Sequence, residues 1–250
     1  MGIVRGISTK HGETTSNVYI HMDKPLDQAV VLSVDPPTPG PKGPDRLVSS
    51  VAVRVGIDAF AIFPNAQRTT LIADVDDIKF VGLPGLTGAL SGSRFVSTSR
   101  AGTGMYAGTP AAIVGRYLTT DASLVVSIDG FVQVPVLEVP GPGDRFDGRN
   151  LKVGRAPGGA QVGVNVFRVS AGSGLVEWLI ASPGNKTQVV LPDIATIGLA
   201  LPSGQVNITV YGGHASDGSL VYESLLYRHL DSRGWTAYSY DTFNRYYGDP

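Results

Sequence analysis

Apolar and polar residues alternate along much of this chain. In Val51–Val55 the valines fall on one face, and in Gln205–Tyr211 the residues Val206, Ile208 and Val210 alternate with polar ones. Such alternation is typical of a β-strand with one buried face. The same pattern predicts strands over Asn17–Met22, Ala29–Val34, Ile57–Phe63, Thr69–Ala73, Ile78–Val81, Leu124–Ile128, Phe131–Leu137, Val162–Val169, Leu175–Ile180, Gln188–Leu191, Leu220–Tyr227 and Trp235–Tyr240.

The best helical candidate is Pro110–Leu118, because a proline fits the first turn of a helix. Gly115 and the β-branched Ile113 and Val114 weaken this interpretation. Many short strands at roughly 8–12-residue spacing, without helices between them, favour antiparallel sheets over βαβ units. We therefore expect an all-β chain of two antiparallel β-sandwich domains in tandem, of the immunoglobulin or fibronectin-III-like kind.

Turn signals predict how these strands connect. Asp129-Gly130 and Asp217-Gly218 each lie between two apolar runs, which is a strong hairpin signal. The most turn-rich stretch, 140–159, places a domain boundary near residue 148. The sequence thus predicts a first domain over 1–148 and a second over 149–250. A proline-rich segment, 35–44, is expected to form an extended loop in the first domain.

Composition narrows the function classes. The 250 residues include 32 glycines and 17 prolines, which is turn-rich β composition. A net charge of −1 gives no overall basic field, so neither nucleic acid nor an anionic membrane is expected as a partner. The absence of cysteine excludes disulfides, thiolate metal sites and a cysteine nucleophile. No stretch approaches the ~18 apolar residues of a membrane helix, so no transmembrane segment is expected.

Catalytic and metal-binding patterns are weak. No GxSxG elbow is present, and the spacing of carboxylates in space cannot be derived from sequence, so we expect no enzyme activity. Asp74, Asp76 and Asp77 could supply oxygen ligands to Ca²⁺, although neighbouring residues of a strand face opposite ways and a solvated strand end is the alternative. No other cofactor is expected.

The strongest binding signal is the aromatic C-terminal stretch. Aromatic side chains offer a large apolar area, and those of Tyr and Trp also carry a polar group, which suits sugar rings or a partner protein. The alternative is a closing strand packed on the second sandwich. The candidate ligand-binding residues are Trp235, Tyr238, Tyr240, Phe243, Tyr246 and Tyr247.

Three runs carry a family resemblance: Val75–Pro84, Asp129–Pro135, and Leu175–Ile180 with Leu191–Asp193. Together they resemble extracytoplasmic β-sandwich lipoproteins of gliding or predatory bacteria, whose modules are similar to carboxypeptidase regulatory-like and fibronectin-III-like domains. The resemblance spans roughly residues 70–225. It implies export, anchoring at the cell envelope and a role in interaction, with no catalytic residues to carry over.

The sequence departs from that family pattern, because it has neither a leader nor a lipobox cysteine. Export then requires a leader removed from the mature chain. We expect a non-enzymatic extracytoplasmic binding or structural protein that acts through sandwich loops and sheet faces. Its partner would be a protein, a polysaccharide or a second copy, with Gly2–Thr9 adding to a neighbour's sheet. A glycan-active or glycan-binding protein, using the aromatic stretch and dispersed carboxylates, is the alternative.

Overall fold

The protein consists almost entirely of strands joined by turns. The computed structural model describes residues 1–4, 7, 10–39, 43–55, 59–103, 109–119, 125–215, 222 and 235–248, without the side chains of 116–119 and 173. The strands are β1 (Gln28–Val34), β2 (Arg46–Val55), β3 (Ala59–Leu71), β4 (Ile78–Leu83), β5 (Arg94–Gly102), β6 (Ala111–Thr119), β7 (Val125–Ile128), β8 (Pro135–Val139), β9 (Asn150–Arg155), β10 (Val164–Ala171), β11 (Val176–Pro183), β12 (Gln188–Val190), β13 (Gly204–His214) and β14 (Ala237–Tyr247).

Besides strands, the described residues form short 3₁₀ turns, among them η1 (Ile72–Asp74), η2 (Gly88–Leu90), η3 (Gly172–Gly174) and η4 (Ile194–Ile197). The all-β prediction is confirmed. The helical alternative over Pro110–Leu118 is wrong, because this segment is strand β6, paired on both sides. Among the described residues no helix is long and apolar enough to cross a membrane.

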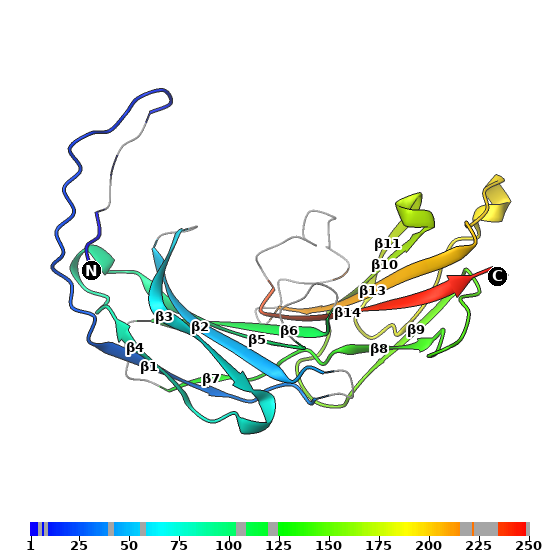
Figure 1. Cartoon of the computed structure of the whole chain (residues 1–250), viewed down its shortest axis with the longest axis horizontal. Coiled ribbons are helices and arrows are strands. Elements are labelled where there is room, and N and C mark those ends of the chain that lie inside the picture. Colours follow the sequence, from blue (N-terminus) through cyan, green and yellow to red (C-terminus); the bar gives the residue numbers. More distant parts are fainter. Residues whose placement is uncertain are drawn as a thin grey trace.

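Three sheets build the molecule in two layers. One sheet has eight strands in the order β11-β10-β13-β14-β6-β5-β2-β3, and two small sheets have the orders β4-β1-β7 and β12-β9-β8. All neighbours are antiparallel except β1 and β7, which are parallel. Figure 1 shows the eight-stranded sheet bowed along the length of the molecule, with the two small sheets side by side beneath it. The predicted antiparallel sheets are confirmed. We call the part of the molecule around the β4-β1-β7 sheet the first half and the part around the β12-β9-β8 sheet the second half; the eight-stranded sheet, the long sheet, extends through both.

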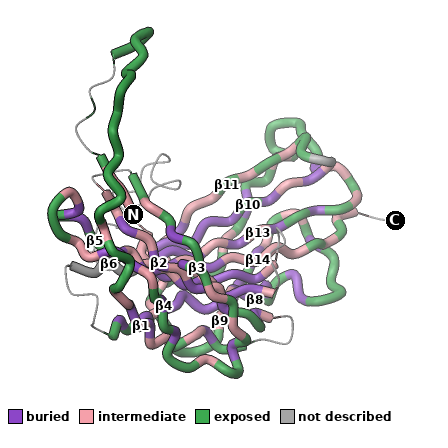
Figure 2. Tube along the Cα trace, turned by 60° about the vertical axis from the view of Figure 1, so that its left-hand side comes forward, coloured by how far each residue is buried: buried purple, intermediate pink, exposed green. Residues whose placement is uncertain are grey.

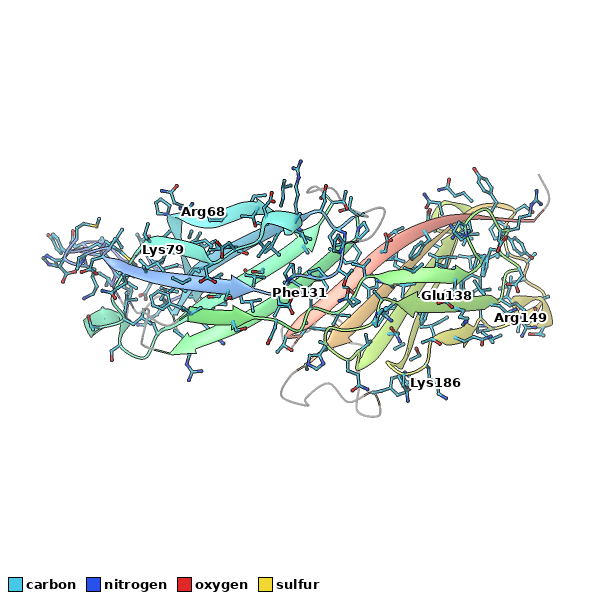
Figure 3. The ribbon with its side chains drawn as sticks, turned by 90° about the horizontal axis from the view of Figure 1, so that it is seen from below. Arg68, Lys79, Phe131, Glu138, Arg149 and Lys186 are labelled. Atoms are coloured by element: carbon cyan, nitrogen blue, oxygen red, sulfur yellow. The ribbon has the colours of Figure 1, made fainter. Side chains whose placement is uncertain are left out.

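Each small sheet closes its own hydrophobic cluster against the long sheet. The first cluster contains Val30, Leu32, Leu47, Val51, Val53, Phe80, Leu83, Phe95, Ile128 and Phe131, among others. The second contains Leu137, Phe146, Leu151, Val153, Phe167, Val169, Val206, Ile208 and Val210. Phe131 lies where the two halves meet (Figure 3). The change of cluster falls between Val132 and Leu137, and the boundary of two independently folding domains near residue 148 stays a prediction.

The last strand joins the two halves into one sheet. β14 pairs with β13 along its whole length, and its first residues, Ala237–Tyr240, also pair with residues 111–114 of β6. The hydroxyl of the fully buried Ser239 donates a hydrogen bond of 2.8 Å to the Gln133 carbonyl, which lies in the segment crossing between the halves. The C-terminal strand therefore links both sheets of the second half to the edge of the first.

Two predicted connections differ in the structure. Gly130 has a positive φ of 73°, but residues 129–134 form neither a turn nor a strand, β7 pairs with β1, and the chain then crosses to the other half. The predicted Asp129-Gly130 hairpin is therefore wrong. Phe131 and Val132, in the crossing segment, are buried. Asp217-Gly218 lies outside the described residues. So does the predicted strand Leu220–Tyr227 apart from Tyr222, whose hydroxyl donates to the Ala181 carbonyl of β11.

An N-terminal arm projects from the first half. Its described residues up to 27 contain no strand, and they are exposed almost throughout (Figure 2). The predicted strand Asn17–Met22 is wrong, because no neighbouring strand pairs with it. The arm folds back at its base, where the Met1 ammonium donates to the Lys24 carbonyl and the Lys24 N–H donates to the Met1 carbonyl.

Residues of the predicted strand-adding segment, Gly2–Thr9, are placed only in part. Ile3 packs against the first hydrophobic cluster, so the described start of this segment contacts its own chain. Arg5, Gly6, Ser8 and Thr9 lie outside the described residues. The described exposed apolar residues of the arm instead include Tyr19 and Met22, at 78% and 77% exposure.

The edge strand β3 carries features that oppose pairing with another sheet. Its register against β2 shifts between Ser50 and Ala52, and β3 contains Pro64 and Asn65, the latter with φ of 61°. A proline and a bulge interrupt the row of free N–H and C=O groups on an edge. Self-assembly through this edge is therefore disfavoured, although Ile62 is exposed there.

A row of serines crosses the first cluster. Ser49 and Ser99 are fully buried and share a hydrogen bond of 2.8 Å. Ser97 is equally buried, but its hydroxyl has no hydrogen-bond partner among the described residues. A buried hydroxyl without a partner costs free energy, whereas one with a partner contributes to stability.

Replacing buried serines with alanine distinguishes a hydroxyl that has a hydrogen-bond partner, as in Ser239, from one that has none among the described residues, as in Ser97. We expect Ser239→Ala to lower the free energy of unfolding by about 1–3 kcal/mol, because the Gln133 carbonyl loses its donor inside the protein. Ser97→Ala is the matched control, and it should leave the stability unchanged or raise it. Urea denaturation of the two variants measures both values. Equal losses in the two variants would contradict this account of the junction.

Candidate functional site

The long sheet has one covered face and one open face. Leu47, Phe95, Val114, Val210 and Ile208 point toward the small sheets, and the residues between them in each strand point the opposite way. The small sheets cover only one side of the long sheet (Figure 1). We call the side without them, in the part of the chain that the structure describes, the open face.

An aromatic cluster lies at the middle of the open face. The register places Tyr211 opposite Tyr240 and Gly213 opposite Tyr238, so their side-chain positions share this face. The rings of Tyr211 and Tyr240 lie 5.5 Å apart between centroids, tilted by 36°. This spacing is typical of a favourable aromatic pair. We define the aromatic cluster as Tyr211, Trp235, Tyr238 and Tyr240.

Trp235 covers the backbone of β13. A Cβ added to Gly213 would collide with the six-membered ring of the Trp235 indole. The indole therefore lies directly on the glycine, beside Tyr238 of the neighbouring strand. Thr236 holds this approach in place, since its N–H and hydroxyl both donate to the His214 carbonyl, at 2.9 and 3.1 Å.

Arginines adjoin the cluster on the first half of the open face. Arg100 is opposite Ile113, and Ile113 is in turn opposite Tyr238. Arg46, Arg54 and Arg94 share the same face by register. Strands β2, β3, β5 and β6 contain no aspartate or glutamate. These four strands therefore contribute only basic charge to the face, although the whole chain has a net charge of −1.

The surroundings of Tyr238 shift its ionisation. Burial raises the pKa of Tyr238 above its ordinary value, Arg100 opposes the shift, and Tyr240 adds to it. A raised pKa means that the folded state favours the neutral phenol. The stability from Tyr238 is thus complete below the ordinary tyrosine pKa of about 10 and is lost as the pH rises through the folded value.

The structure divides the predicted aromatic residues between two faces. Trp235, Tyr238 and Tyr240 gather in the aromatic cluster. Tyr246 shares the face but lies near the other end of β14 and is 64% exposed. The remaining two pack against the second hydrophobic cluster, and the ring of Tyr247 contacts Phe146 edge-on. These two, Phe243 and Tyr247, have the packing role that was the alternative interpretation.

The predicted calcium ligands do not converge. Asp74 ends the turn η1, and the Asp76 carboxylate accepts the N–H of Asp77 at 2.8 Å. The described residues contain no group of three histidine, cysteine, aspartate or glutamate side chains that could hold a metal ion. The geometry of Asp74, Asp76 and Asp77 therefore gives no support to calcium binding.

Sequence reasoning missed two members of the site. Tyr211 ends the predicted strand Gln205–Tyr211, and the alternation of Val206, Ile208 and Val210 already implied that it faces outward. Arg100 gave no such signal, because its closeness to Tyr238 depends on the pairing of β14 with β6. The first residue could have been found from periodicity, and the second required the fold.

Comparisons with known proteins add little to this geometry. No family model and no curated protein matches the chain. A solved structure, the two fibronectin type-III domain segment from chicken tenascin, shares 11% identity over 90% of this chain and 94% of its own, with a TM-score of 0.28. Of the resemblance expected from sequence, only its fibronectin-III part has a counterpart in this match, and nothing in it concerns lipoproteins. The all-β class rests on the strands themselves.

The contact between Trp235 and Gly213 can be tested by a substitution that adds a methyl group to Gly213. We expect Gly213→Ala to displace the indole, lower the free energy of unfolding by about 1–3 kcal/mol and shift Trp235 fluorescence to longer wavelength. Trp178→Phe leaves Trp235 as the sole indole for this measurement. Gly115→Ala is the control, because an added Cβ there meets open space. An unshifted emission in Gly213→Ala would refute the contact.

The ionisation of Tyr238 provides a second test. A difference titration of tyrosinate absorbance between the native chain and Tyr238→Phe should give a pKa above the ordinary tyrosine value. Arg100→Met should raise this pKa further, because it removes the charge that opposes the shift. Arg149→Met, in the second half, should leave it unchanged. A lower pKa in Arg100→Met would exclude the proposed proximity.

Proposed function

We propose that this chain is a non-enzymatic binding protein whose open face binds the acidic surface of a partner protein. The observation that carries the proposal is the combination of an aromatic cluster with arginine-bearing strands on the open face. Tyrosine, tryptophan and arginine dominate the binding energy of protein interfaces. Aromatic residues supply desolvated contact area, while the arginines select a partner of opposite charge.

The charges on the open face predict the charge of the partner. The four arginines are Arg46, Arg54, Arg94 and Arg100, and the strands that carry this half of the face have no acidic residue. A partner with carboxylates opposite this region would associate faster at low salt, since opposite potentials accelerate encounter. Residues in the aromatic cluster would mainly set the lifetime of the complex.

A glycan is the second candidate ligand. Asn207 and Asn244 face each other on the open face, and Gln205 is opposite Tyr246. Amide side chains beside aromatic rings offer hydrogen bonds and stacking, the combination that sugar rings use. The glycan proposal thus rests on the second half of the face, whereas the protein proposal rests on the first.

Location at the cell envelope belongs to the same proposal. It is supported by the sequence resemblance to extracytoplasmic β-sandwich proteins, and fractionation of the native organism would test it. Self-assembly is an extension of the proposal that would use the exposed arm residues Tyr19 and Met22. Light scattering over a range of concentrations would test it, and a monomer at every concentration would exclude it.

Loss of the aromatic cluster should abolish partner capture. We expect immobilised Trp235→Ala/Tyr240→Ala protein to lose, at least tenfold, a protein that the native chain retains from an envelope extract, because hot-spot truncations cost about 2 kcal/mol or more each. Tyr19→Ala is the matched control, since it removes an exposed aromatic from the arm. A glycan array, run with the same variants, identifies a sugar ligand. Equal retention by both variants would contradict binding through the open face.

A further inference from the structure

A pocket lies between the layers on the covered side of the long sheet, near the meeting point of the two halves. Its volume is about 240 Å³, it is partly open to solvent, and the loop after β9 and the turn between β11 and β12 line it. Gln133 and Arg155 lie toward the interior, while Gly158, Asn185 and Thr187 form an exposed rim. It is distinct from the aromatic cluster, which lies on the opposite face of the same sheet.

The alternation of β9 directs Arg155 into this pocket. Leu151 and Val153 pack in the second hydrophobic cluster, and Arg155 continues the same side of the strand. Its guanidinium lies over Gly212 of β13, where any larger residue would collide with Nη2. A glycine at this position of the sheet thus makes room for a cation between the two layers.

Arg155 is partly buried, and no described residue compensates its charge. Its Nε and Nη2 atoms are inaccessible to solvent and have no hydrogen-bond partner among the described residues. Burial lowers the pKa of Arg155 to about 10, so the side chain still carries its charge at neutral pH. A buried cation costs several kcal/mol unless a counter-charge and acceptors compensate it.

The walls of the pocket supply no such counter-charge. None of the described residues lining it is an aspartate or glutamate. Glu138, which lies against Gly154, forms an ion pair of 2.9 Å with Lys152. The lining instead offers the neutral polar side chains of Gln133, Asn185 and Thr187. The pocket therefore has a single positive charge, amide and hydroxyl groups, and a small volume.

We propose that this pocket binds a carboxylate, which the charge of the Arg155 guanidinium attracts. Nε and Nη2 pack over Gly212, so the ligand meets the part of the guanidinium that lines the pocket. Hydrogen bonds between a guanidinium and a carboxylate are charge-assisted and stronger than neutral ones. One negative charge balances one arginine, whereas dianionic phosphate would leave a charge uncompensated in the interior. The volume is below that of typical drug-sized sites, so the ligand is a small carboxylic acid or one acidic side chain of a peptide.

The decisive experiment compares two ligands of the same shape. Calorimetric titration of the native chain with propionate should show binding, and propionamide, which lacks the charge, should bind at least tenfold more weakly. A capped glutamate-containing tripeptide, in a parallel titration, distinguishes a peptide side chain from a free acid as the source of the carboxylate. Equal affinity for propionate and propionamide, or tighter binding of inorganic phosphate, would overturn the proposal.

Variants assign the binding to Arg155. Arg155→Met should reduce propionate affinity at least tenfold and, without ligand, raise the urea midpoint, because it removes a buried charge that lacks a partner. Lys186→Met is the control: Lys186 lies between two rim residues but does not line the pocket, and it points away from the body (Figure 3). This variant should keep its affinity within twofold. Unchanged binding in Arg155→Met would refute the assignment.

A spectroscopic measurement keeps the test valid if Arg155→Met does not fold. In the native protein, the Nε–H resonance of Arg155 should shift on addition of propionate and stay in place with propionamide, since a negative charge beside the guanidinium polarises its N–H groups. Arg155→Lys, which retains the charge but lacks this resonance, provides its assignment. A resonance unaffected by propionate would contradict direct contact. This inference does not depend on the function proposed for the open face.

Discussion

The pairing of β14 with β6 is the interaction on which the rest of the structure depends. It involves only Ala237–Tyr240 and residues 111–114, yet it merges the strands of both halves into one eight-stranded sheet. Without it, each half would end in an unpaired edge, which is a site for non-native association. With it, the cationic strands β5 and β2 and the aromatic strands β13 and β14 share a single face. The surface that we propose as a binding site exists only because of this short ladder.

Two consecutive glycines of β13 place different chemistry on the two sides of that sheet. Gly213 faces outward and admits the Trp235 indole, while Gly212 faces inward and admits the Arg155 guanidinium. Glycine normally weakens a strand, because it adds no packing and loses more entropy on folding than other residues. Here the close approach of a large side chain on each side compensates for that loss. The aromatic cluster and the interior pocket are thus one peptide unit apart and are supported by the same backbone.

Sequence alone predicted the local structure better than the long-range pairing. Alternation identified the strands because burying one face of a sheet imposes a period of two, as in Val51–Val55. It failed for Asn17–Met22, where the pattern exists but no strand forms and none of the described strands pairs with it. The Asp129-Gly130 signal correctly located the end of a strand, but turn residues do not determine which strand the chain joins next. Arg155 continues the inward-facing positions of Leu151 and Val153. A charged residue at such a position indicates a site, and this signal was already present in the sequence.

The order of synthesis gives the β14–β6 pairing a further consequence. Residues 111–114 leave the ribosome long before residues 237–240, so β6 lacks its β14 partner until residues 237–240 have been made. Contacts between such distant segments form slowly, because the chain between them must first lose its freedom. During this interval the flat apolar row Ala111–Val114 is an exposed edge in a half-finished protein. Truncation of even the last strand would therefore leave the first half with an open edge, and the N-terminal half would aggregate more readily than the whole.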